Sequence, residues 1–150
     1  MYVDSGVIVD PGTTLKILPN TAIYFEPGSK MIIDTGASVT LMDSAQFYFS
    51  TNCSLIVNGT LEALGSREDV MKFLPTGTGG PGSWGGIVVK QGGRIKMKNA
   101  YVKNAKVGLT LDGASGDTVS NCRFYNSSQC GIKYLNNSNA IISYNKIFCD

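Results

Sequence analysis

The most constraining feature of the sequence is an eight-residue repeat in its first half. Seven pairs of apolar residues recur eight positions apart without a slip, and the two members of each pair are two positions apart. The pairs are Val7/Val9, Leu15/Ile17, Ile23/Phe25, Met31/Ile33, Val39/Leu41, Phe47/Phe49 and Leu55/Val57. A spacing of two puts both side chains on one face of a strand. The repeating unit is therefore a short strand with one apolar face.

Turn-forming residues separate these strands in the same register. Three prolines lie eight apart, and the next position holds residues that accept a left-handed backbone or bond their own main chain. These two sets are Pro11, Pro19 and Pro27, and then Gly12, Asn20, Gly28, Gly36, Ser44 and Asn52. Three such units wound into a coil of about 24 residues bury every apolar pair and hydrogen-bond each strand to the coils above and below. Left-handed solenoids use shorter sides, so the repeat predicts a right-handed coil.

The second half of the chain repeats over a whole coil instead of over one strand. Val102 and Asn104 recur as Phe124 and Asn126, and Gly108-Leu109 recurs as Gly131-Ile132. The interval is about 22–23 residues, within the range of solenoid repeats. Asn104 above Asn126 predicts an asparagine ladder whose side-chain amides bond one another.

The two periods together predict the fold. We expect an all-β chain that forms a single-stranded right-handed parallel β-helix of about six coils, each of about 22–24 residues. It forms one domain over 1–150, with octad coils over 1–63 and a loop excursion over 64–86. Coils of the longer repeat, about 22–23 residues each, then occupy 87–150.

Composition narrows the chemistry that such a solenoid can carry. The sequence has no histidine, which removes the commonest general base and metal ligand. Residues 1–75 hold four basic and eight acidic side chains, whereas residues 76–150 hold nine basic and three acidic ones. No apolar run is long enough to span a membrane, and residues 1–12 lack the pattern of a signal peptide. The four cysteines form no CxxC pair, so stacked buried thiols are favoured over zinc, with disulfides left open: Cys53, Cys122, Cys130 and Cys149.

Several segments of this chain resemble a known family. They are Val9-Asp10-Pro11-Gly12-Thr13-Thr14-Leu15, Val57-Asn58-Gly59-Thr60-Leu61-Glu62-Ala63, Trp84-Gly85-Gly86-Ile87, and Asn121-Cys122-Arg123-Phe124 with Gly131-Ile132. The chain resembles right-handed parallel β-helix repeat proteins of the pectate-lyase-like superfold, most of all the repeat regions of secreted or surface bacterial proteins. The resemblance implies an extracellular or cell-surface location. Because the repeat starts by Val7 and still runs at 144–148, we expect further coils, a cap or a neighbouring domain of a longer chain.

The resemblance also implies catalytic residues that can be sought here. Hydrolases of this family use paired aspartates, a Gly-His-Gly segment and an Arg-Ile-Lys segment. Arg94-Ile95-Lys96 is present, but no histidine and no preceding aspartate pair accompany it. Lyases of this family need an acidic calcium cluster and a nearby arginine or lysine. The sequence leans against an enzyme, because no catalytic set is assembled.

The best calcium candidate is the set Asp10, Asp34 and Asn58. These residues recur at one interval of three octads, so a coil of that length stacks them about 4.8 Å from one another. Like charges at that spacing repel, and a bound Ca²⁺ would relieve the repulsion. Asp and Asn at a strand-to-corner step also commonly bond the corner backbone, and we favour this structural role. No cofactor is otherwise expected.

Residues between the inward pairs face outward and form two apolar ladders in the first half. Ile8, Ile32 and Ile56 fall on one face, and Tyr24 stacks on Tyr48 on another. The isoleucine ladder is an exposed apolar strip, and three explanations of it stay open. A cap or neighbouring domain covers the strip, the strip is a self-association face, or its side chains shield one another. For the tyrosines we favour stabilisation of the sheet over stacking on sugar rings.

The outward residues of the second half are basic and aromatic. The coil period places Tyr101, Arg123 and Lys146 in one column, with Lys103 nearby. Such a face suits an acidic polysaccharide or another polyanion, and a solvated charged face that keeps the sheet soluble is the alternative. No nucleic-acid module is recognised.

These observations favour one function over two others. We expect a non-catalytic β-helical scaffold or adhesin-type segment of an extracellular or cell-surface protein, in contact with acidic polysaccharide. The first alternative is a fragment of a polysaccharide lyase or glycoside hydrolase whose catalytic coils lie outside this chain. The second is a self-assembling structural β-helix.

Overall fold

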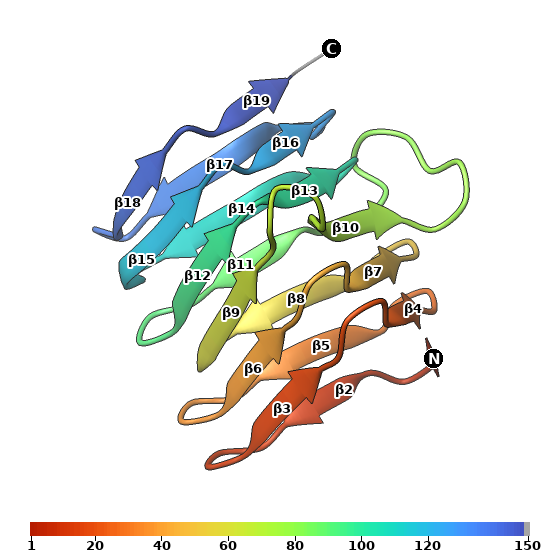
Figure 1. Cartoon of the computed structure of the whole chain (residues 1–150), viewed down its shortest axis with the longest axis horizontal. Helices are drawn as coiled ribbons and strands as arrows, with labels where there is room; N and C mark the ends of the chain where they lie inside the picture. Colours follow the sequence, from red (N-terminus) through yellow and green to blue (C-terminus); the bar gives the residue numbers. More distant parts are fainter. Residues whose placement is uncertain (149–150) are drawn as a thin grey trace.

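The computed structural model describes residues 1–148. Over these residues the chain winds into a right-handed parallel β-solenoid of about six coils that contains no α-helix. Figure 1 shows the coils stacked in sequence order from the N-terminal to the C-terminal end. The prediction of an all-β, single-stranded, right-handed parallel β-helix is confirmed.

Each coil contributes one strand to each of three parallel sheets, named here A, B and C. Sheet A contains β1 (Tyr2–Val3), β4 (Ala22–Phe25), β7 (Gln46–Phe49), β10 (Met71–Pro75), β13 (Ala100–Lys103), β16 (Arg123–Tyr125) and β19 (Lys146–Phe148). Sheet B contains β2 (Val7–Val9), β5 (Lys30–Ile33), β8 (Ser54–Val57), β11 (Ile87–Val89), β14 (Val107–Asp112) and β17 (Cys130–Leu135). Sheet C contains β3 (Thr14–Ile17), β6 (Ser38–Leu41), β9 (Thr60–Leu64), β12 (Arg94–Lys98), β15 (Ser115–Ser120) and β18 (Asn139–Ser143).

The strand registers reproduce the periods of the sequence. Ile8 pairs with Ile32, and Ile32 pairs with Ile56, so each of the first coils is three octads long. Val102 pairs with Phe124, which is the shorter coil period of the second half. A short strand with an apolar pair is thus buried by its neighbours one coil away, as the octad pattern requires.

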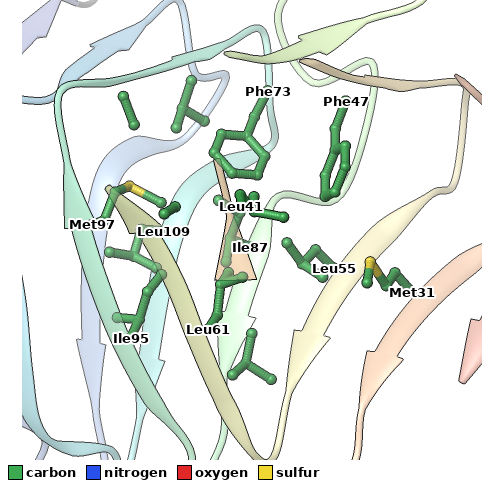
Figure 2. Close-up of a cluster of buried hydrophobic side chains, with 14 of the residues drawn as sticks. Met31, Leu41, Phe47, Leu55, Leu61, Phe73, Ile87, Ile95, Met97 and Leu109 are labelled. Carbon is green, nitrogen blue, oxygen red and sulfur yellow. The ribbon is translucent and has the colours of Figure 1, made fainter. Parts of the chain in front are cut away.

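The inward side chains of the three sheets form one continuous core. Figure 2 shows ten of them pointing into the solenoid: Met31, Leu41, Phe47, Leu55, Leu61, Phe73, Ile87, Ile95, Met97 and Leu109. An aromatic stack fills the end of sheet A nearest sheet B. Phe25 stacks on Phe49 at a centroid distance of 4.8 Å, and Trp84 stacks on Phe49 at 4.2 Å. The indole Nε1 of Trp84 donates a hydrogen bond to the Lys103 carbonyl at 2.9 Å, so its buried N–H is satisfied.

The expected excursion over residues 64–86 contains a strand of the stack. β10 pairs with β7 and β13, and it buries Met71 and Phe73. The chain therefore leaves the stack twice, in a first loop of residues 65–70 and a second loop of residues 76–86, which protrudes beyond β10 in Figure 1. The strand was hidden from the repeat because the two loops lengthen this coil. Phe73 pairs with Phe47 on one side and with Val102 on the other, and both intervals in the chain are longer than a regular coil.

Asparagines in the left-handed conformation line two corners of the second half. Asn99 and Asn121 turn the chain from sheet C to sheet A, and Asn104 and Asn126 turn it from sheet A to sheet B. The predicted amide-to-amide bond of the Asn104–Asn126 ladder is wrong, because Asn104 Nδ2 donates to the Gly79 carbonyl of the second loop. The link between these coils is a main-chain one, from Asn104 N to the Tyr125 carbonyl at 2.9 Å.

One carboxylate interrupts the apolar core. The ladder between β12 and β15 begins at Lys96 and Thr118, and the strand register of β15 shifts between Ser115 and Asp117. Ile95 and Asp117 lie one residue before the first pair of this ladder. There the carboxylate Oδ1 of Asp117 accepts a hydrogen bond from Ile95 N at 2.7 Å. Asp117 is 1% exposed, and within residues 1–148 its Oδ2 has no partner. Its side chain thus replaces a missing main-chain acceptor, with one oxygen left buried and unpaired.

Burial raises the pKa of Asp117 above 3.8, its ordinary value. Because the folded state then holds the proton more tightly than the unfolded state, the stability contribution is full below 3.8 and is lost as the pH rises through the raised pKa. Asp117→Asn keeps the Oδ1 acceptor and removes the charge. We expect it to abolish this part of the pH dependence and to raise the free energy of unfolding at pH 7, because no charge is then buried at this position.

Urea denaturation at several values between pH 3.5 and pH 8 measures the effect. The control is Asp112→Asn, because hydrogen bonds from Lys90 and Asn136 lower the pKa of this half-buried carboxyl and give it the opposite pH dependence. A wild-type and an Asp117→Asn protein with parallel stability curves would contradict the prediction.

Candidate functional site

The outer face of sheet A carries two adjacent hollows that the two loops border. The larger, here called the basic hollow, has a volume of about 820 Å³, and the first loop borders it through Arg67 and Glu68. The smaller, here called the loop hollow, has a volume of about 480 Å³, and Gly77 to Gly79 of the second loop line it. Tyr101 lines both hollows and joins them.

The predicted basic column lies in the basic hollow. Tyr101 of β13 pairs with Arg123 of β16, and Arg123 pairs with Lys146 of β19, so the three residues are one coil apart in succession. All three line the basic hollow. Lys103 stands in the next column, paired with Tyr125, and lines the loop hollow. The structure therefore brings three of the four predicted residues into one recess and puts the fourth beside it.

The lining of the basic hollow carries a net positive charge. The ion pairs of residues 1–148 lie on the other two sheets, between Lys90 Nζ and Asp112 Oδ2 at 2.7 Å and between Lys96 Nζ and Glu62 Oε1 at 2.9 Å. Arg123 and Lys146 thus form no ion pair with a carboxylate in that part of the chain. Glu68 is the one carboxylate in the lining of this hollow, against three basic side chains.

The Tyr101 phenol is a neutral donor beside these charges. Burial raises its pKa above the ordinary value of 10.0, and the neighbouring Tyr125 raises it further. The hydroxyl therefore stays protonated at neutral pH. A neutral phenol beside unpaired cations is able to donate a hydrogen bond to an anionic or hydroxyl-rich ligand.

The first loop is a fixed wall of the hollow. Asn99 Nδ2 donates to the Gly65 carbonyl at 2.7 Å, and Ser44 Oγ donates to Asp69 Oδ1 at 2.8 Å. Ser66 N donates to Asp43 Oδ1 at 3.1 Å. These bonds join the loop to the corner of the coil below and to the coil above.

Sequence reasoning missed several residues of this surface. The predicted excursion over 64–86 includes Lys72 and Leu74, although the alternation of Met71 and Phe73 is the signal of a strand with outward neighbours. The other missed lining residues are Arg67, Glu68, Tyr125, Tyr144 and Phe148. Tyr125 had a usable signal, since it follows the inward Phe124 by one position. The loop residues had none, because a repeat does not specify where an insertion folds back.

The two apolar ladders form columns on the outer faces. Tyr24 stacks on Tyr48 at 4.7 Å with an interplanar angle of 7°, and Tyr2 extends this stack at 5.0 Å. The Tyr48 hydroxyl donates to Gln46 Oε1 at 2.7 Å. Such ring stacking stabilises the sheet whatever else it does.

The isoleucine ladder stands on the outer face of sheet B. Ile8 is 61% exposed, whereas Ile32 and Ile56 are half-buried, and Val88 continues the column. What covers these side chains stays a prediction.

The proposed calcium ligands lie in one column at the ends of the sheet B strands. Asn58 Nδ2 donates to Asp34 Oδ1 at a long 3.5 Å, so the amide contributes its donor to the carboxylate. Further along, Lys90 supplies a positive partner to Asp112. Within residues 1–148, no three residues of the His, Cys, Asp and Glu types stand together as metal ligands. Calcium at Asp10, Asp34 and Asn58 stays a prediction.

The described cysteines are free thiols. Cys53 and Cys122 are buried and Cys130 is half-buried, while Cys149 lies outside the described residues. Burial raises the pKa of the Cys122 thiol to about 11, so it stays protonated and unreactive at neutral pH. Cys122 underlies the basic hollow as a packing residue.

The three stacked parallel sheets, the inward apolar pairs and the asparagine corners define the class of parallel β-solenoid proteins. Within that class, the chain is a right-handed parallel β-helix repeat protein, and its residues 76–149 match the family model described as the right handed beta helix region. Comparison with curated proteins gave no match, and neither did comparison with solved structures. No helix of the described residues is long and apolar enough to cross a membrane.

Proposed function

We propose that this β-helix is a scaffold or adhesin-type segment of an extracellular or cell-surface protein and holds an acidic polysaccharide in the basic hollow of sheet A. One observation carries the proposal. Arg123 and Lys146 lie one coil apart in a recess of about 820 Å³, and within residues 1–148 neither has a carboxylate partner. Unpaired, neighbouring cations in a recess favour an anionic ligand.

The geometry supports a polymer that runs along the solenoid axis. Successive members of a column are about 4.8 Å apart, the spacing of neighbouring strands. A chain that follows the axis would therefore meet Tyr101, Arg123 and Lys146 in turn. A guanidinium binds a carboxylate through two parallel hydrogen bonds, and an ammonium adds a point charge. The first and second loops, which precede and follow β10 in the chain, limit the path of the polymer.

The lining of the hollow supports binding rather than hydrolysis. Glycoside hydrolysis usually takes two carboxyl groups placed on either side of the scissile bond. The lining contains one carboxylate, Glu68, on the first loop. The lining of the basic hollow is instead rich in aromatic rings and cations. These are the groups that hold a charged sugar polymer in place.

The test is retention of the protein on immobilised polygalacturonate and alginate. Reversing both central charges, in Arg123→Glu with Lys146→Glu, is expected to lower the affinity at least about tenfold, because each hydrogen bond to a charged group contributes about 1.5–3 kcal/mol. The matched control is Arg94→Glu with Lys98→Glu, which makes the same charge change on the exposed outer face of sheet C. Wild-type retention should weaken as salt is raised.

Two outcomes would overturn the proposal. One is a wild-type protein that is not retained on either polysaccharide at low salt. The other is equal loss of retention in the two double variants, because a general effect of net charge would then explain the binding and the hollow would not.

A further inference from the structure

Tyr144 is an exception in one corner of the solenoid. The corner from sheet C to sheet A holds Asn99, Asn121 and Tyr144 in successive coils, and all three have a left-handed backbone with φ of 49°, 53° and 54°. Asparagine tolerates this conformation, whereas a bulky aromatic residue rarely adopts it. Tyr144 is also 86% exposed. A strained, exposed tyrosine therefore stands where the repeat itself uses asparagine.

The neighbouring coil imposes this conformation on Tyr144. Asn145 Oδ1 accepts a hydrogen bond from Cys122 N at 2.7 Å, and Asn145 Nδ2 donates to the Val119 carbonyl at 2.8 Å. Asn121 N donates to the Ser143 carbonyl at 3.1 Å. These bonds hold the residues on both sides of Tyr144 in place. Strain of this kind persists when the surroundings over-determine it, and it is enriched at binding sites.

The Tyr144 side chain borders the basic hollow. It lines the recess together with Tyr101, Arg123 and Lys146. Within residues 1–148, no hydrogen bond holds its hydroxyl, and no aromatic ring stacks on its own, unlike the paired rings of Tyr24 and Tyr48. In the described part of the chain the ring thus makes neither a hydrogen bond nor a ring stack, while it adds a flat apolar surface to a cationic recess.

We infer that Tyr144 is a specificity-determining residue, which makes the basic hollow select anions carried on six-membered sugar rings over anions carried on a flexible linear chain. The inference rests on the proposed function and concerns the same site. The apolar face of a pyranose ring packs on a tyrosine ring, and the carboxylate of the same sugar then reaches the cations of the column. A linear polyanion offers the carboxylates without the ring.

The experiment compares two probes with the same charged group. Oligogalacturonate carries its carboxylates on pyranose rings, and poly-glutamate of matched charge carries them on a flexible chain. The wild-type protein is expected to bind oligogalacturonate at least about tenfold more tightly by calorimetry. Tyr144→Asn should remove this preference while leaving the affinity for poly-glutamate within about twofold. Tyr144→Phe should keep the preference, because the ring remains.

A stability measurement accompanies the binding data. Tyr144→Asn restores the residue that the corner uses in the two preceding coils, so its melting temperature should rise by about 2–4 °C. A variant that is more stable yet has lost the preference shows that the ring serves the ligand and does not serve the fold.

The outcomes separate this inference from the function on which it rests. A wild-type protein that binds neither probe overturns both. Equal wild-type affinity for the two probes overturns the inference alone, as does a Tyr144→Asn protein that keeps the preference. In those two cases the basic hollow still binds polyanions, and the proposed function stands.

Discussion

Replacing Phe47 with aspartate is expected to leave the chain unfolded. Phe47 is 1% exposed on the inward face of β7. Its ring makes edge-on contacts with Phe25, Phe49 and Phe73 at centroid distances of 5.8, 6.1 and 5.6 Å. Losing a buried phenylalanine ring costs about 3–5 kcal/mol, and burying an unpaired carboxylate adds several more. Since a domain is stable by about 5–15 kcal/mol in total, one substitution removes most of the margin.

Circular dichroism and size-exclusion chromatography check this result. The control is Gln46→Asp, which places the same carboxylate one position earlier on the outward face of β7, beside Lys72 of β10. This control should keep the β-sheet spectrum and the compact elution volume. A Phe47→Asp protein that melts cooperatively near the wild-type temperature would contradict the assignment of Phe47 to the core.

The second large effect is expected at Gly86, where the second loop rejoins the stack. Gly86 has a φ of 98°, and a Cβ added there would lie 1.7 Å from the Val107 carbonyl oxygen. Left-handed backbone strain costs a residue with a Cβ about 1–2 kcal/mol, and forced overlap in a packed region adds about 1–3 kcal/mol. Gly86→Ala should therefore lower the free energy of unfolding by about 3 kcal/mol.

Gly92→Ala separates strain from overlap. Gly92 is also left-handed, with a φ of 82°, but a Cβ there meets no heavy atom within 4 Å. Its substitution should cost only the conformational part, about 1–2 kcal/mol. Urea denaturation of the two variants measures the difference. Equal losses would mean that the main chain near Val107 moves away freely and that the close packing of coils at Gly86 is unimportant.

The regular coils could be predicted from the sequence because one local pattern fixes both the strand and its burial. A pair such as Val39 and Leu41 predicts a strand and its inward face, and the interval to the next pair predicts the period. The observed strand registers follow from this repetition. The corner asparagines were also readable, since Asn104 and Asn126 occupy positions that need a left-handed backbone. What failed was the partner of the Asn104 amide, because the acceptor comes from a loop outside the repeat.

The candidate site could be predicted only in part for the same reason. The column of Tyr101, Arg123 and Lys146 follows from the coil period, and the strand pairing places it as expected. The hollow around it depends on where the first loop folds back, and hydrogen bonds to Asp43 and Ser44 decide this. Such contacts join residues far apart in the chain and leave no periodic trace. Tyr144 belongs to the repeat, but its importance appears only when its backbone conformation is known.

Within residues 1–148, each strand pairs only with the strands three places before and after it in the chain. A gene that duplicated or lost one whole coil would therefore leave all the other pairings intact, and the length of the rod would change without a new fold. The loops that border the sheet A hollows flank a single strand, β10. The reach of the molecule and the shape of its recess are thus encoded in separate segments, so evolution is free to alter either one while it conserves the other.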